Sequence, residues 1–147
     1  MSAPVLVSAC LVGFPCRHDG RDRRDEALLQ RLAGRDIVPV CPEVAGGLGV
    51  PRLPATLTLE GRVLDQSGAD VTAQFAAGAL AAVEAAVHWQ CESAILKANS
   101  PSCGTSQTNV AWSRVPGRGV AAAALASAGV GVSDETGSFQ HHSVDPG

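Results

Sequence analysis

Short apolar runs recur along the chain and are separated by loops rich in glycine and proline. The runs at 5–9, 37–40, 94–96 and 129–132 have the length and composition typical of buried strands. Pro39 lies inside the second run and cannot donate a hydrogen bond to a neighbouring strand. We therefore expect that strand at the edge of a sheet.

Helical periodicity occupies the stretches between these runs. Acidic residues open a predicted helix over 25–32, and an alanine-rich segment predicts another over 120–128. The longest helix should run to about His88, with Asp70 or Thr72 as its cap. Its apolar positions recur every four residues, which predicts a stripe that faces the core. The stripe comprises Val71, Phe75, Ala79, Val83 and Val87, with Leu80 beside it.

Strands that alternate with helices predict right-handed crossovers and a mostly parallel sheet. We expect a single Rossmann-like α/β domain over residues 1–147, with a core from about 4 to 134 and flanking helices. Two segments depart from this alternation. Residues 57–64 should form a hairpin with a two-residue turn at Glu60-Gly61, and residues 99–117 should form a long loop.

The reactive side chains gather where the predicted strands end. Cys10 ends the first strand, Cys41 and Glu43 follow the second, and Ser-Pro-Ser-Cys at 100–103 follows the third. Parallel strands share one carboxyl-end edge, and open α/β sheets bind their ligands outside that edge. Cys16 lies in the loop after Cys10 and can fold back over the same place. The sequence therefore predicts one site that contains several thiols and a carboxylate.

Composition and charge narrow the possible partners. The net charge is −3 without a basic run, and three Phe, two Trp and no Tyr leave few platforms for stacked bases. Both facts argue against a nucleic-acid polymer as partner. No apolar stretch reaches the roughly 18–20 residues that span a bilayer, so we expect no membrane association. We expect a monomer or a homodimer.

The two ends of the chain carry further expectations. The apolar run before Cys10 is short and follows no Lys or Arg, which argues against an export signal and predicts a cytoplasmic protein. Residues 135–147 are expected to form a polar tail in which His141 and His142 are solvated.

Five cysteines in a reducing compartment argue for metal or catalytic chemistry rather than for a disulfide framework. The chain has no Cys-x-x-Cys pair, so a thioredoxin-type dithiol and a zinc ribbon both lose support. Thiolates from separate loops suit an iron–sulfur cluster, whose irons accept ligands from different directions. Four cysteines would close such a cluster, whereas three would leave one iron open to a substrate.

Most of these residues belong to motifs that follow one another in a fixed order over about residues 5–133. The motifs are Ser-Ala-Cys-Leu-Val-Gly at 8–13, Cys-Arg-His-Asp-Gly at 16–20, Val-Cys-Pro-Glu-Val-Ala-Gly-Gly-Leu at 40–48, Pro-Arg at 51–52, Gly-Ala-Asp-Val-Thr at 68–72 and the segment 96–104. Together they resemble the 2-thiouracil desulfidase family, small bacterial iron–sulfur proteins long catalogued as a domain of unknown function.

The resemblance implies a cofactor, a reaction and a set of site residues. The cofactor is a [4Fe–4S] cluster, and its three ligands map onto Cys10, Cys16 and Cys103. Glu43 maps onto a catalytic glutamate, and Ser100, in preference to Ser102, onto a catalytic serine. In the implied reaction, thiouracil and water give uracil and hydrogen sulfide. Our hypothesis is that the open iron binds the substrate sulfur while Glu43 activates water and Ser100 donates or relays a proton.

The chain departs from the family pattern at three places that should line or flank the pocket. His18 stands where the family usually has tyrosine, Thr56 where it has glutamate, and Gln-Thr-Asn-Val-Ala-Trp at 107–112 replaces an aromatic-Asp-Gly element. These departures bear on which substrate is bound and leave the cluster assignment intact. Further candidates for the pocket wall are His18, Cys41, Arg52 and Lys97, while Cys91 is expected to be a bystander.

Two other functions stay open at this point. One is an iron–sulfur redox or sulfur sensor without turnover, which a fourth ligand such as Cys41 would favour. The other is a metal-free thiol enzyme in which Cys103 is the nucleophile and His18 its base.

Overall fold

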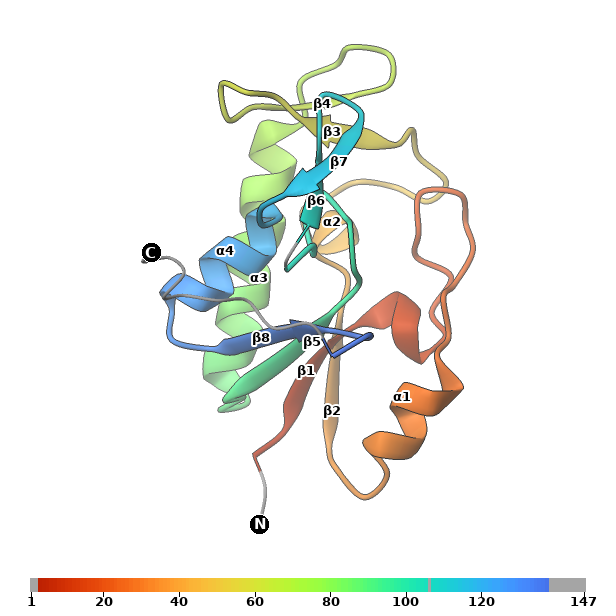
Figure 1. Ribbon diagram of the computed structural model, residues 1–147, viewed down its shortest axis with the longest axis vertical. Helices are drawn as coiled ribbons and strands as arrows, with labels where there is room; N and C mark the ends of the chain where they lie inside the picture. Colours follow the sequence, from red (N-terminus) through yellow and green to blue (C-terminus); the bar gives the residue numbers. More distant parts are fainter. Residues whose placement is uncertain (1–2, 106, 138–147) are drawn as a thin grey trace.

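Four parallel strands form the main sheet of the protein, shown in Figure 1 as a computed structural model that describes residues 3–105 and 107–137. The strand order is β2-β1-β5-β8. The strands are β1 (Val5–Ser8), β2 (Ile37–Val40), β5 (Ser93–Leu96) and β8 (Gly131–Asp134). All four residues of β1 are buried, and β2 with its Pro39 forms an edge of the sheet. Both sequence predictions are confirmed, whereas β8 begins two residues later than expected.

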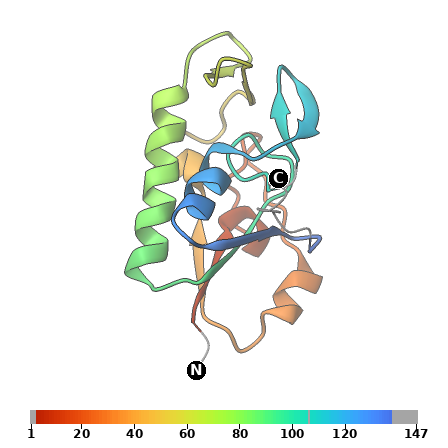
Figure 2. The same ribbon diagram turned by 60° about the vertical axis from the view of Figure 1, so that its left-hand side comes forward.

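Helices cover both faces of this sheet, which confirms the predicted α/β class. Helix α1 (Glu26–Arg31) packs through Leu28 against the face of the sheet that carries Val5 and Val7. The Asp25 carboxylate accepts the Leu28 N–H at 2.9 Å and caps this helix. Helices α3 (Thr72–His88) and α4 (Val120–Ser127) pack on the opposite face (Figure 2). No helix in the described part of the chain is long and apolar enough to cross a membrane.

The predicted stripe of α3 is confirmed over its first part and departs from the buried face towards the C-terminal end of the helix. Val71, Phe75 and Ala79 are buried, whereas Leu80 is 58 % exposed and Val87 is 70 % exposed. Repeated steps of four residues drift around an α-helix, which has 3.6 residues per turn, so the stripe leaves the core before the helix ends. Its cap differs as well. Val71 occupies the N-cap position, and the Asp70 carboxylate accepts the Thr72 N–H at 2.9 Å.

A second sheet, of order β4-β3-β6-β7, stands apart from the parallel one. It consists of β3 (Ala55–Leu57), β4 (Val63–Asp65), β6 (Gln107–Val110) and β7 (Ser113–Pro116). The prediction of a long loop over 99–117 is therefore wrong, because this segment contains the β6–β7 hairpin. Its turn is Ala111-Trp112, and neither residue is typical of a two-residue hairpin turn, which favours glycine or asparagine.

The β3–β4 hairpin is confirmed, but its turn is one residue longer than predicted. The Thr58 N–H donates to the Arg62 carbonyl at 2.8 Å, which leaves three residues, 59–61, in the turn. Gly61 has φ +82°, the left-handed conformation that such a turn requires at its last position.

Short helix α2 (Pro42–Ala45) follows β2 directly and lies against α3 in an unusually close contact. A Cβ atom added at Gly78 of α3 would lie 1.9 Å from the Pro42 carbonyl oxygen, and one at Gly46 equally close to the Gln74 carbonyl oxygen. Only glycine permits two backbones to approach this closely. The contact determines where α2, and with it Glu43, lies beside the parallel sheet.

The predicted polar tail begins later than expected. Glu135 accepts the Ala98 N–H at 2.8 Å and pairs with the Lys97 ammonium at 3.0 Å, so it belongs to the folded structure. His141 and His142 lie outside the described residues.

We predict that Gly78→Ala destabilises the protein. In a helix this change normally adds about 0.8–1 kcal/mol of stability, but here the new methyl group would meet backbone, and such overpacking typically costs about 1–3 kcal/mol. Urea unfolding should therefore show a lower free energy of unfolding. Gly131→Ala, at the start of β8, is the control for a methyl group added without a clash, because its Cβ would make only an ordinary contact at 3.8 Å. Equal stabilities of the two variants would contradict the close contact.

Candidate functional site

A pocket of about 520 Å³ opens at the carboxyl ends of β1, β2 and β5. The chain passes from β1 to β2 on one side and returns to β5 on the other, so the pocket lies at the switch point of the parallel sheet. Ser8 marks the place where β1 and β5 separate, because its Oγ accepts the Lys97 N–H at 2.8 Å. Nine of the ten site residues suggested by the sequence line this pocket. They are Cys10, Cys16, His18, Cys41, Glu43, Arg52, Lys97, Ser100 and Cys103.

The thiols of Cys10, Cys16 and Cys103 reach the pocket from two separate segments, the connection that follows β1 and the turn that follows β5. Cys10 lies on the 3₁₀ helix η1 (Ala9–Val12), which continues directly from β1, and Cys103 lies in the turn that follows β5. Both are buried, whereas Cys16, in the loop after η1, is half-buried. None of the five cysteines is in a disulfide. Cys16 folds back over the end of β1 as predicted, and the three thiols share one pocket.

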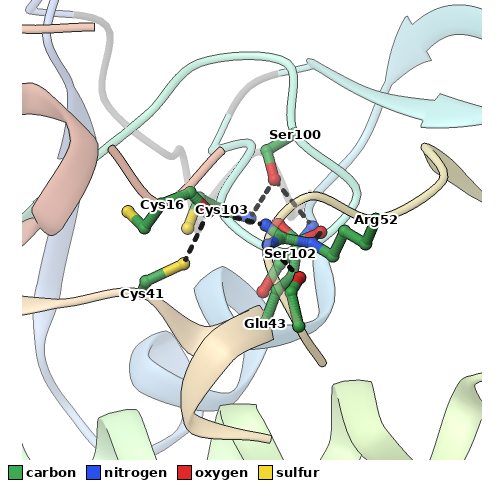
Figure 3. Close-up of polar contacts among 8 residues, drawn as sticks. Cys16, Cys41, Glu43, Arg52, Ser100, Ser102 and Cys103 are labelled. Carbon is green, nitrogen blue, oxygen red and sulfur yellow. Dashed lines mark hydrogen bonds and ion pairs between the residues drawn. The ribbon is translucent and has the colours of Figure 1, made fainter. Parts of the chain in front are cut away.

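Cys41 adds a fourth thiol to the same wall. It is the N-cap residue of α2, and its Sγ donates to the Cys16 carbonyl oxygen at 3.7 Å (Figure 3). Cys91 is different, because it lies in the hydrophobic core beneath the C-terminal end of α3. The core position of Cys91 agrees with the sequence prediction.

Burial and mutual proximity make these thiols weak acids in the metal-free protein. Burial raises the pKa of Cys103 to about 12. The neighbouring Cys10 thiol raises the pKa of Cys16, and the Cys16 thiol raises that of Cys41. All three therefore keep their protons near neutral pH, and a metal that binds them has to displace those protons.

Glu43 lies in the first turn of α2 and pairs with Arg52 across the pocket wall. The Arg52 Nε atom is 3.4 Å from a Glu43 carboxylate oxygen, and both side chains are largely buried. The same guanidinium donates to the carbonyl oxygen of Cys16 at 3.0 Å and to that of Gly49 at 3.1 Å. One arginine thus connects the candidate base to the loop that carries a candidate ligand (Figure 3).

The two candidate serines occupy different places. Ser100 lines the pocket, and its Oγ accepts the N–H groups of Ser102 and Cys103, both at 3.1 Å. Ser102 lies behind the wall with 0 % exposure, beside the Cys103 sulfur, and its hydroxyl has no hydrogen-bond partner among the described residues. The geometry therefore gives only Ser100 access to a bound molecule.

The remaining pocket candidates differ in how firmly they are held. The Lys97 ammonium pairs with Glu135, which holds it at the pocket wall. The His18 carbonyl oxygen accepts the Arg52 backbone N–H at 2.8 Å, and the residue lines the pocket.

The second sheet supplies a wall that the strand prediction missed. Asn109, Trp112 and Arg114 of the β6–β7 hairpin line the pocket opposite the parallel sheet. Thr108 fastens this hairpin to the site, because its hydroxyl donates to the Ser100 carbonyl oxygen at 2.9 Å. In β6 the polar residues Gln107 and Asn109 alternate with Thr108 and Val110, and this alternation could have predicted the strand. The resemblance did place residues 107–112 near the pocket, and that expectation is confirmed for Asn109 and Trp112.

The donor set fits a polynuclear cluster better than a single metal ion. Among residues 3–105 and 107–137, no three His, Cys, Asp or Glu side chains converge closely enough to bind one ion. The thiols instead surround a pocket large enough for a small inorganic core, and the buried hydroxyl of Ser102 beside Cys103 has no partner of its own. Irons of a cluster are separated and accept thiolates from different sides. The residues present therefore fit a [4Fe–4S] cluster.

Fold and site together define a small α/β protein with a thiol-rich pocket at the switch point of its parallel sheet. The chain belongs to the 2-thiouracil desulfurase family, which matches residues 5–137. The family expected from the sequence is confirmed.

Two relatives support this assignment. A solved structure described as a [4Fe–4S]-dependent thiouracil desulfidase, TudS, is similar to this chain with a TM-score of 0.84 and 38 % sequence identity, over 92 % of each chain. The uncharacterized protein YbbK of Bacillus subtilis (strain 168) is 34 % identical over 143 residues, which cover 89 % of this chain and 95 % of YbbK.

The contrast between the two serines gives a prediction for the metal-free protein. Ser102→Ala should raise the free energy of unfolding by about 1 kcal/mol, because a buried hydroxyl without a partner costs about that much or more. Ser100→Ala should lower it by about 1 kcal/mol, because two backbone N–H groups lose their acceptor. Urea unfolding of both variants beside the wild type measures the difference. If Ser102→Ala instead lowered the free energy of unfolding and Ser100→Ala raised it, the Ser102 hydroxyl and not that of Ser100 would stabilise the fold.

Proposed function

We propose that this protein is a [4Fe–4S]-dependent desulfidase that replaces the sulfur of a thiolated nucleobase such as 2-thiouracil with oxygen from water. One C=S bond is broken, one C=O bond is formed, and both protons of water leave with the sulfur as hydrogen sulfide, so no electrons are transferred. The observation that carries the proposal is the convergence of a carboxylate, a hydroxyl and free thiols on one pocket, in a chain of the 2-thiouracil desulfurase family.

Cys10, Cys16 and Cys103 are the proposed cluster ligands, because they match the motifs of the family, line one pocket and are not in disulfides. When bound, the cluster would supply an iron without a protein ligand, a Lewis acid suited to the soft sulfur of the substrate. In this proposal Cys41 is a wall residue and not a fourth ligand.

Glu43 is the proposed general base that takes a proton from the attacking water. Its carboxylate lies on the pocket wall, and the Arg52 guanidinium holds it in place through an ion pair. Because Arg52 also binds the carbonyl oxygen of Cys16, the base is fixed relative to the ligand loop. A positioned base of this kind contributes about 10²–10⁴-fold to a rate.

Ser100 is the proposed proton donor towards the leaving sulfur or a ring nitrogen. Its oxygen already accepts two backbone N–H groups. The hydroxyl proton is therefore the part of Ser100 that remains for a bound molecule.

The two alternative functions are less well supported. A metal-free thiol enzyme needs a reactive thiolate, but burial raises the pKa of Cys103 to about 12, and no hydrogen bond joins Cys103 to His18 among the described residues. A sensor without turnover needs no general base, yet the pocket holds Glu43 in a buried ion pair. Cytoplasmic location and a monomeric or homodimeric state stay predictions.

The deciding experiment is sulfide release by protein that has been reconstituted with iron and sulfide without air. We expect about four irons per chain and conversion of 2-thiouracil to uracil with one sulfide per turnover. A loaded protein that converts no thiolated base in a panel would favour the sensor, and a colourless protein with activity would favour the thiol enzyme.

Replacement of the candidate base should separate catalysis from cluster binding. We predict that Glu43→Gln keeps the iron content and visible absorbance of the wild type and lowers kcat for 2-thiouracil by about 10²–10⁴-fold. The amide can still accept from Arg52 but cannot take a proton from water. Loss of iron together with activity would make Glu43 a structural residue instead.

Replacement of single cysteines should identify the ligands. We predict that Cys10→Ala, Cys16→Ala and Cys103→Ala each lose most of their iron after anaerobic reconstitution. Cys91→Ala is the matched control, a buried thiol outside the pocket, and should retain it. Iron analysis and visible absorbance measure the outcome. Loss of iron from Cys41→Ala as well would contradict a three-cysteine site.

A further inference from the structure

Trp112 is a large aromatic residue in an unusual position on the pocket wall. It lies at the tip of the β6–β7 hairpin and lines the pocket, and half of the residue, 50 %, is exposed. Trp112 has φ +64° and the preceding Ala111 has φ +50°, both in the left-handed region. Bulky residues rarely adopt this conformation, and glycine or asparagine would form the same turn without strain.

Three hydrogen bonds hold the strained turn in place. The Trp112 N–H donates to the Thr56 hydroxyl at 2.9 Å, and the Ala111 N–H donates to the Leu57 carbonyl oxygen at 2.8 Å. Thr56 is only 3 % exposed, and its hydroxyl in turn bonds the side-chain oxygen of Asn109. The second sheet therefore fixes the backbone of Trp112 from behind, where Thr56 does not itself line the pocket.

The fold gains little from a tryptophan at this position. Trp112 belongs to none of the hydrophobic core clusters of the described residues, and its exposed ring gives up burial that tryptophan usually has. Strained backbone persists where the surroundings enforce it, and such residues cluster at ligand-binding sites. Trp112 lies on the pocket wall, so ligand binding is a function that would account for this strain.

We propose that Trp112 is the aromatic platform on which the planar ring of the substrate stacks, and that Thr56 is the residue that positions it. This inference rests on the proposed function and deepens it, because it assigns recognition of the ring face to the second sheet. Stacking is tolerant of ring substituents, since every nucleobase has a π-face. The contact persists unchanged as the C=S carbon reacts, so its loss should raise KM and leave kcat nearly unaltered.

The kinetic test compares two replacements of Trp112 in the reconstituted enzyme with 2-thiouracil as substrate. Trp112→Ala should raise KM about tenfold or more at nearly constant kcat, and Trp112→Phe should stay within about threefold of the wild type, because it keeps a stacking ring. Thr56→Val, which replaces the hydroxyl with a methyl group of similar size, should give an intermediate KM with unchanged iron content. If Trp112→Ala releases sulfide with an unchanged KM, the stacking inference is overturned while the proposed desulfidase function stands.

A binding measurement provides a readout that does not depend on turnover. The chain has two tryptophans, and Trp89, the C-cap residue of α3, does not line the pocket. In a Trp89→Phe background, titration with uracil should therefore quench the fluorescence of Trp112 alone. No change in fluorescence at uracil concentrations that inhibit turnover would contradict stacking. If the wild type releases no sulfide from any thiolated base, the proposed function fails and this inference fails with it.

Stability separates a binding role from a structural one. Asparagine accepts the left-handed conformation more readily than tryptophan, so Trp112→Asn should unfold at a higher urea concentration than the wild type while its KM rises as in Trp112→Ala. A lower unfolding midpoint for Trp112→Asn would mean that the ring serves the fold and would overturn the inference.

Discussion

The parallel direction of β1, β2 and β5 is the constraint on which the site depends. Three strands that run the same way must deliver their following loops to one edge, whatever the loops contain. At that edge β1 and β5 separate, and the Ser8 hydroxyl completes their last contact by accepting the Lys97 N–H. The pocket exists because the backbones diverge beyond this hydrogen bond.

Two contacts turn this edge into a site with a defined geometry. The glycine contact between α2 and α3 sets the position of Glu43 beside the sheet, since Gly46 and Gly78 let the two backbones lie in direct contact. Arg52 then joins Glu43 to the carbonyl oxygen of Cys16. Base and ligand loop are thereby coupled through one guanidinium, although they lie on different segments of the chain. A shift of either segment would displace both.

The sequence predicted the parallel sheet well because its strands are buried on both faces and appear as continuous apolar runs. Once the sheet is predicted as parallel, its topology alone brings Cys10, Glu43 and Ser100 together at one edge, so the sequence predicted this site as well. The β6–β7 hairpin escaped prediction because Ala111-Trp112 carries none of the usual turn residues. The C-terminal part of the buried face of α3 was not predicted because eight of the 17 residues of this helix are alanine, and alanine suits a buried and an exposed surface equally. The choice of three ligands among five cysteines came only from the resemblance.

The pocket has two walls, one at the ends of the parallel strands and one formed by the second sheet, and we assign them different roles. Residues that match the family motifs lie at the ends of the parallel strands, where Cys10, Glu43 and Ser100 face the pocket. Two of the three departures from the family, Thr56 and residues 107–112, lie in the second sheet. Residues that take part in the reaction, at the ends of the parallel strands, need fixed positions relative to the cluster. The wall formed by the second sheet has only to fit the face and edge of the substrate ring. A protein built this way can change which thiolated base it accepts by altering a hairpin, without disturbing the loops proposed to hold the metal.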